Sequence, residues 1–137
     1  MPFVIKSHPR RIGGTSAPTV TFTEWAYEHA DPQDGEAAVW FTAETSGGFG
    51  LFALGRIQGS AIDAGKSATG KDLVEVTAVF HTFEPVRPLG KADFSILPRI
   101  GSGPPIQELN RRLYINAHAK IASINAETFD FLEERFR

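Results

Sequence analysis

The stretch from 72 to 83, DLVEVTAVFHTF, constrains the fold of this chain more than any other, because apolar and polar side chains alternate along most of its length. A period of two is the pattern of a β-strand with one buried face. The apolar positions that share this face are Val74, Val76, Ala78 and Phe80. The stretch therefore predicts a long strand.

Four other segments are typical of strands or of their connections. Residues 3–7 are a short apolar run, which predicts a buried strand at the centre of a sheet. Residues 36–44 carry apolar side chains on both faces, and residues 49–57 extend again after a short connection, which favours an antiparallel hairpin. Residues 119–124 predict the last strand. The small and polar residues of 57–71 predict a loop.

Helices are expected at three places. In 18–35, apolar residues at helical spacing and a capping box of Thr21 and Glu24 predict a short helix. A proline pair at 104–105 opens a second helix, and Asn125 caps a third. Strands and helices do not alternate in βαβ units, so we predict the α+β class, with a strongly bent mixed sheet or small barrel flanked by short helices.

Length and composition set broad limits. A chain of 137 residues predicts a single domain over 1–137. Its 14 basic and 16 acidic side chains give a net charge of -2, so bulk charge indicates no partner. The absence of cysteine excludes disulfides, thiolate zinc sites and cysteine nucleophiles. The first residues resemble neither a signal peptide nor a membrane span, so we expect a cytoplasmic protein without membrane contact.

The glycine-rich stretch SGGFGLFALGRI, from 46 to 57, could either hold a phosphate or turn the chain. A phosphate-binding loop needs a helix directly after it, whereas here a strand follows, and the lysine-serine pair of a P-loop is missing. The glycines therefore predict a turn. Common hydrolase, zinc-protease and calcium motifs are missing as well, and the four histidines match no compact metal spacing. We therefore expect no catalytic centre, metal or cofactor.

Aromatic and basic residues are more informative about binding. Trp25 and Trp40 lie close in sequence, and aromatic rings can stack on a flat base, although core packing is their commoner role. The strand around Trp40 is apolar on both faces, which favours the core, whereas Trp25 lies beside a polar loop. The basic residues that could hold phosphates, if the fold brings them to one surface, are Arg10, Arg11, Arg111 and Arg112.

Two stretches resemble a known group of domains. FVIKSH at 3–8 and FTAETSGGFGLFALGRI at 41–57 are similar to the opening strand and the hairpin of the YTH and EVE branch of the PUA-like superfamily. Segments 71–87 and 121–136 resemble a later strand and the closing helix. The resemblance implies a bent, barrel-like mixed sheet flanked by helices. It also implies a non-catalytic domain that binds nucleic acid and places a modified base in an aromatic pocket.

The same resemblance implies a set of site residues. Lys6, Ser7 and His8 match the end of the family's first strand, which lines the pocket, and Trp25 matches the first tryptophan of its aromatic cage. The second cage tryptophan has no counterpart in the loop after the hairpin, which favours the bacterial EVE type over recognition of N6-methyladenine in RNA. The other candidates for the base pocket are Trp40, Thr42 and Phe49.

Bacterial EVE-like domains often accompany nucleases that cut DNA carrying modified cytosine. The resemblance thus implies a flipped 5-methylcytosine or 5-hydroxymethylcytosine as the ligand and a modification-dependent restriction nuclease as a partner or fused domain. Three alternatives remain open at this point. They are an RNA-binding PUA-like protein acting on modified, transfer or ribosomal RNA, an ASCH-type hydrolase using Lys6 with Glu44 or Glu75, and a scaffold without a ligand pocket.

Overall fold

The computed structural model describes residues 1–10, 12, 17–44, 47–96, 103–114 and 119–137. Its strands are β1 (Phe3–Ser7), β2 (Thr19–Ala26), β3 (Ala37–Thr42), β4 (Gly50–Ile57), β5 (Ile62–Lys66), β6 (Asp72–Phe83) and β7 (Lys120–Ser123). Its helical segments are η1 (Tyr27–His29), α1 (Lys91–Ile96), α2 (Pro104–Leu109), the π-helical turn η4 (Asn110–Tyr114) and α3 (Ala126–Glu134).

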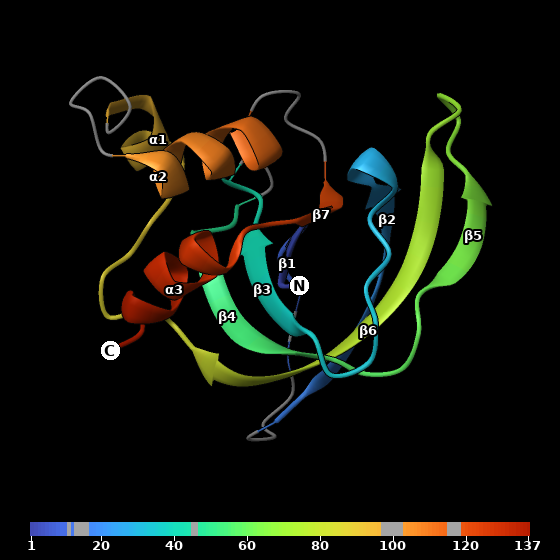
Figure 1. Cartoon of the computed structure of the whole chain (residues 1–137), viewed down its shortest axis with the longest axis horizontal. Coiled ribbons are helices and arrows are strands. Elements are labelled where there is room, and N and C mark those ends of the chain that lie inside the picture. Colours follow the sequence, from blue (N-terminus) through green and yellow to red (C-terminus); the bar gives the residue numbers. More distant parts are fainter. Residues whose placement is uncertain (11, 13–16, 45–46, 97–102, 115–118) are drawn as a thin grey trace.

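Six of the strands close into a small mixed barrel (Figure 1). The order is β2-β7-β1-β3-β4-β6, and the barrel closes because β2 also pairs with β6. β1 is parallel to β3 and antiparallel to β7, whereas β5 lies outside the barrel on β6. Helices α1, α2 and α3 lie along one side (Figure 1). This architecture confirms the predicted α+β class and the bent, barrel-like sheet.

Two apolar cores explain why β3 is buried on both faces. Inside the barrel, Trp40 packs among phenylalanine rings, with ring centroids 5.2 Å from Phe22 and 5.2 Å from Phe80. On the other face of β3, Val39 and Phe41 belong to a second core that includes buried side chains of α2 and α3. The strands predicted at 3–7, 36–44, 49–57, 72–83 and 119–124 are confirmed within one or two residues.

The helix predicted in 18–35 is wrong. The chain forms β2 instead and pairs with β6 over seven residues, from Thr19 opposite Val79 to Trp25 opposite Leu73. Threonines at alternate positions face outward along β2, which suits a strand because β-branched side chains pack well on a pleated surface. Long-range pairing therefore overrides the local helical spacing, and only the short turn η1 follows.

Two further segments differ from expectation. The loop predicted at 57–71 contains β5, a fully exposed edge strand whose polar sequence carries no apolar alternation. The helix α1 lies in a stretch rich in proline and glycine that gave no helical signal. The helices predicted at 104–105 and after Asn125 are confirmed, although no side-chain capping bond is made by Asn125 in the described structure.

The backbones of the paired strands β4 and β6 approach each other closely at Gly55, next to the register shift between Leu54 and Gly55. A Cβ atom built on Gly55 would lie 2.0 Å from the carbonyl oxygen of Val79 and 2.8 Å from the Cα of Phe80. Both contacts are with backbone, so neither neighbour can move without opening the pairing of β4 with β6.

We therefore expect Gly55→Ala to lower the free energy of unfolding by about 2–4 kcal/mol, measured by urea denaturation. The control is Gly35→Ala, because Gly35 has open space around it and only a left-handed φ of +85°. That strain costs about 1–2 kcal/mol. A smaller loss of unfolding free energy in Gly55→Ala than in Gly35→Ala would contradict the close approach of β4 and β6 at Gly55.

Candidate functional site

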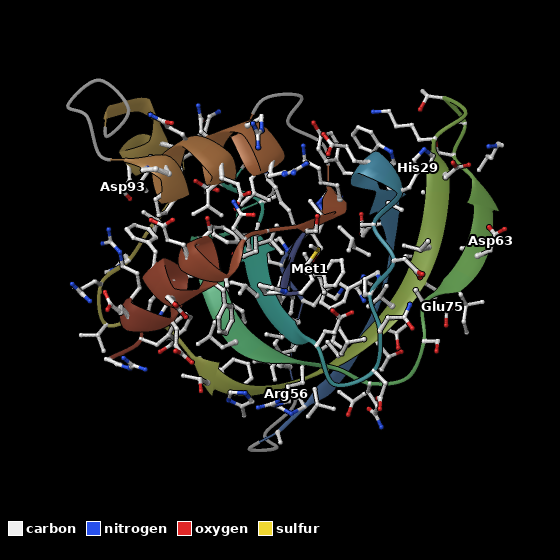
Figure 2. All side chains as sticks on the ribbon, viewed as in Figure 1. Met1, His29, Arg56, Asp63, Glu75 and Asp93 are labelled. Atoms are coloured by element: carbon white, nitrogen blue, oxygen red, sulfur yellow. The ribbon has the colours of Figure 1, made fainter. Side chains whose placement is uncertain are left out.

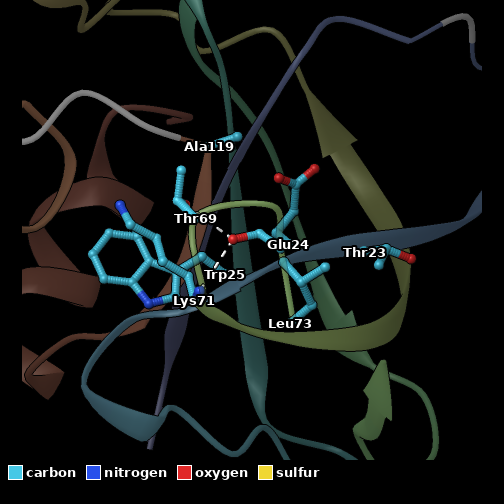
Figure 3. Close-up of a pocket in the computed structure, with 8 residues that line it drawn as sticks. Thr23, Glu24, Trp25, Thr69, Lys71, Leu73 and Ala119 are labelled. Carbon is cyan, nitrogen blue, oxygen red and sulfur yellow. Dashed lines mark hydrogen bonds between the residues drawn. The ribbon is translucent and has the colours of Figure 1, made fainter. Parts of the chain in front are cut away.

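A pocket of about 420 Å³ opens beside the second half of β2 (Figure 3). Its volume is within the range of small-ligand sites, and it combines one aromatic wall with a few polar groups. The described residues that line it are Thr23, Glu24, Trp25, Ser67, Thr69, Lys71, Leu73 and Ala119. Trp25 is the one sequence-predicted base-pocket residue in this set.

The turn between β5 and β6 forms one side of this pocket. The Ser67 amide donates to the Lys71 carbonyl at 2.8 Å, and the Lys71 amide donates to the Ser67 hydroxyl at 3.1 Å. The hydroxyls of Ser67 and Thr69 are 3.0 Å apart. Gly70 has a φ of +83°, which the tight turn requires. The segment that lacks the family's second cage tryptophan therefore supplies hydroxyls and an ammonium group to the pocket.

The ring of Trp25 is in contact with cations and with a second aromatic ring. The Lys71 ammonium lies 3.8 Å from its centroid, which is cation–π distance (Figure 3). Tyr27 packs edge-on at 5.1 Å between centroids. The Lys120 ammonium lies 4.5 Å from the Tyr27 centroid and 5.7 Å from that of Trp25. Two rings and two ammonium groups thus form one continuous cluster.

Burial and like charges act on the lysines of this cluster. The Lys120 side chain is 0% exposed, and burial lowers its pKa to about 8, with further lowering by the charges of Lys6, Lys71 and Arg112. Burial also lowers the pKa of Lys6, while Glu44 opposes that shift. The Lys6 ammonium donates to the Leu113 carbonyl at 2.8 Å. Basic residues from distant parts of the sequence therefore converge behind Trp25.

The predicted phosphate-binding residues are divided between this cluster and other surfaces. Arg112 forms an ion pair with Glu28 at 2.6 Å, and its guanidinium lies 5.6 Å from the Tyr27 ring. Arg111 is exposed beside it. Arg10 donates to the carbonyl of Thr21, and its guanidinium lies 4.9 Å from the Phe22 ring. Arg11 lies outside the described residues.

Glu24 adds an acidic group to the pocket on the side opposite the Trp25 ring (Figure 3). Burial raises the pKa of this carboxyl, and the charges of Arg10 and His8 oppose the shift. His8 is exposed directly after β1. Its ring and the Arg10 guanidinium both lie close enough to Glu24 to act on the carboxyl electrostatically. The predicted residues His8 and Arg10 therefore belong to the surroundings of the pocket.

Six of the seven predicted base-pocket residues do not line this pocket. Trp40 is 0% exposed in the barrel core, and its indole donates to the hydroxyl of the buried Ser7 at 2.9 Å. The hydroxyl of buried Thr42 accepts from the Phe49 amide at 2.8 Å, which holds the β3–β4 turn. Phe49 is 74% exposed and lines a separate pocket of about 220 Å³. The predicted base pocket and this pocket therefore share only Trp25, because alternation along β1 and β3 turns Ser7, Trp40 and Thr42 into the barrel.

Seven of the eight described lining residues, and Lys120 behind them, were not predicted as site residues from the sequence. Lys71 and Lys120 border segments without a recognisable binding motif, and Glu24 was assigned to a helix cap. Only the pairing of β2 with both β6 and β7 places Trp25 opposite Leu73 and Lys120.

Other kinds of site are not found in the part of the chain that the structure describes. No group of three or more histidine or acidic side chains there could hold a metal ion. His29 lies at the pocket end of the molecule (Figure 2), where its charge lowers the pKa of Asp72 as a minor effect after Lys66. No helix among the described residues is long and apolar enough to cross a membrane.

Ser7 gives a first test of these assignments. Ser7→Ala leaves the buried Trp40 indole without its acceptor, so we expect a loss of about 1–3 kcal/mol in the free energy of unfolding, measured by urea denaturation. Ligand binding should be unchanged. Ser60→Ala, at an exposed position, is the control. Unchanged stability with altered ligand binding would instead place Ser7 in the pocket.

Lys120 gives a second test, based on pH. The folded-state pKa of Lys120 is about 8 against an ordinary value of 10.5, so between these values the unfolded chain binds more protons. The contribution of Lys120 to the unfolding free energy should therefore rise with pH from about 8 to 10.5, and its full cost is present below pH 8. Urea denaturation at pH 7 and pH 10 measures this rise.

Lys120→Met should remove most of that rise, because methionine does not titrate. Lys66→Met is the control, since Asp72 raises the pKa of Lys66 and its titration lies above the window. An equal rise in the wild-type protein and in Lys120→Met would show that Lys120 keeps an ordinary pKa.

Comparisons with known proteins agree on the fold. No family model and no curated protein sequence matches this chain. Among solved structures, the human THYN1 protein in complex with DNA containing 5-methylcytosine is similar, with a TM-score of 0.66 and 16% identity over 99% of this chain and 98% of that one. The DUF55 domain of human thymocyte nuclear protein 1 has a TM-score of 0.61 and 18% identity over 96% of each chain.

A third similar structure is the NMR structure of Rpa0253 from Rhodopseudomonas palustris, with a TM-score of 0.55 and 15% identity over 98% of this chain and 92% of that one. Each of these likenesses covers at least 96% of this chain. The chain therefore has the same fold as human THYN1 and its DUF55 domain, and this fold is the bent, barrel-like mixed sheet flanked by helices that the sequence resemblance implied.

Proposed function

We propose that this protein is a non-enzymatic reader of a modified base in DNA, and that the base is flipped into the pocket beside Trp25. The observation that carries the proposal is the 420 Å³ pocket with an aromatic wall and a surrounding cluster of cations. The likeness to THYN1, which was crystallised with DNA containing 5-methylcytosine, supports the choice of ligand.

Stacking on Trp25 would offset the cost of base flipping. Removing a base from the duplex costs a few kcal/mol, and stacking on an aromatic side chain is worth about 1–3 kcal/mol. In the ligand-free protein the Lys71 ammonium occupies a face of the ring, so the base displaces it. The displaced ammonium stays at the rim of the pocket, where it can donate a hydrogen bond to the bound nucleotide.

The charges around the pocket suit a polyanion. Burial lowers the pKa of Lys120, and the positive charges of Lys6, Lys71 and Arg112 lower it further. A phosphate group nearby would relieve this repulsion and would raise the pKa of Lys120. Exposed Arg111 extends the basic surface.

A methyl or hydroxymethyl group at cytosine C5 would be read by shape. The pocket has apolar surface at Leu73 and Ala119 and hydroxyl groups at Thr23, Ser67 and Thr69. The methyl contributes a modest apolar contact, since burying one such group is worth about 0.8 kcal/mol. We extend the proposal to a role as specificity module for a separate or fused nuclease, on the basis of the sequence resemblance.

Replacement of the tryptophan tests the proposal. Trp25→Ala should weaken binding to the modified duplex by about 10- to 100-fold and should abolish its preference over the plain duplex, because the stacking partner is lost. Fluorescence anisotropy at one fixed salt concentration measures this with matched duplexes. They carry cytosine, 5-methylcytosine, 5-hydroxymethylcytosine or N6-methyladenine, beside an RNA set.

Two variants serve as controls. Phe49→Ala removes an exposed ring that lines a different pocket, and it should leave the preference intact. Arg111→Ala should weaken modified and plain duplexes alike and, in a separate salt series, reduce the salt slope by about 1, since it removes a phosphate contact. A preference that survives Trp25→Ala would contradict the pocket assignment, and tighter binding to RNA than to any DNA would favour an RNA-binding protein.

A further inference from the structure

Glu24 is the one acidic side chain among the described residues that line the pocket. Along β2 it alternates with Trp25, so it shares the inward face with the buried Phe22 and Ala26 while Trp25 faces outward. Both residues border the pocket because it lies beside the last residues of β2. Figure 3 shows the Trp25 ring with Lys71 on one side of the pocket and Glu24 on the other.

The carboxylate of Glu24 is available as a hydrogen-bond acceptor. Within the described structure no group donates a hydrogen bond to it and it forms no ion pair, although the charges of Arg10 and His8 act on it. Glu24 is partly buried. A ligand that brings an N–H group to this carboxylate would therefore supply the hydrogen bond that water supplies in the open pocket.

Opposite this acceptor, Lys71 provides a donor. A carboxylate on one side and an ammonium on the other match the hydrogen-bonding edge of cytosine, which carries an amino group at N4 and acceptors at N3 and O2. Thymine and uracil present O4 where cytosine presents its amino group. Their oxygen would face the Glu24 oxygens, and this arrangement is repulsive.

We propose that Glu24 is the specificity-determining residue of this pocket, accepting a hydrogen bond from the N4 amino group of a cytosine-type base and rejecting thymine and uracil. The inference rests on the proposed function, which concerns the modified base and Trp25. It goes further because it assigns to one residue the discrimination between cytosine-type bases and thymine or uracil. The 5-substituent is then read by a different part of the pocket.

Four single-stranded oligonucleotides of identical sequence test this inference. They carry cytosine, uracil, 5-methylcytosine or thymine at one position, so that the amino group and the methyl group vary independently. Single strands remove the cost of base flipping, which would otherwise differ between paired and mismatched bases. Dissociation constants are measured by competition against a labelled 5-methylcytosine strand.

In the wild-type protein we expect 5-methylcytosine to bind about tenfold tighter than thymine, and cytosine about tenfold tighter than uracil, which is the scale of a base-edge hydrogen bond. Glu24→Leu should bring both ratios to within about twofold. Glu24→Gln should lower each ratio at least about threefold, because its amide can turn an N–H toward O4. The preference for methylated over unmethylated bases should persist in both variants.

Glu134→Leu is the matched control, because it removes a carboxylate from an exposed position on α3. It should leave all four ratios unchanged. Thermal unfolding checks that each variant is folded, and Glu24→Gln decides the question if Glu24→Leu does not fold. A wild-type ratio retained in Glu24→Gln and Glu24→Leu would overturn the role of Glu24.

The two proposals fail in different ways. If Trp25→Ala abolishes the modified-base preference while Glu24 variants keep the ratio of 5-methylcytosine to thymine, the reader function stands and the role of Glu24 is overturned. If the wild-type protein binds all four strands alike and shows no preference among modified duplexes, the reader function itself is overturned.

Discussion

The pairing of β2 with β6 is the constraint on which the rest of the structure depends. It closes the barrel, and its register sets Trp25 opposite Leu73 at the start of β6. The same end of β2 pairs with β7, which brings Lys120 next to Trp25. A slip of one residue would turn Trp25 into the barrel and Phe22 out of it, because side chains alternate along a strand. The barrel and the pocket therefore share one register.

The aromatic and basic cluster behind the pocket is costly for the free protein. Lys120 is fully buried, and the positive charges of Lys6, Lys71 and Arg112 lower its pKa further. Glu28 pairs with Arg112, and Glu44 opposes the lowering of the Lys6 pKa. Side chains whose pKa is shifted by burial and by like charges are common at sites where a protein binds a ligand. A polyanion is the partner that would relieve the repulsion among these positive charges.

The candidate site could be predicted only in part from the sequence. Trp25 was identifiable from its aromatic character beside a polar segment, and Arg112 from a basic pair. Trp40 was a candidate for the same reason as Trp25, yet its strand lies between two cores and its indole is bound to Ser7. The turn at 67–71 was predicted only as part of a loop, because small polar residues carry no periodic signal. Its contribution depends on pairing with a strand distant in sequence.

The sequence by itself determined the strands with clear patterns and the character of the fold. Three patterns follow from local residue chemistry and predict the bent mixed sheet. They are the alternation of 72–83, the apolar residues on both faces of β3 and the glycines of the turn. Tertiary structure alone decided that 19–26 is a strand, because its threonines gain β6 as a partner only after the barrel closes. It also decided which basic residues meet at Trp25. Strand partners and register are contacts between distant residues, and no local pattern in one sequence records them.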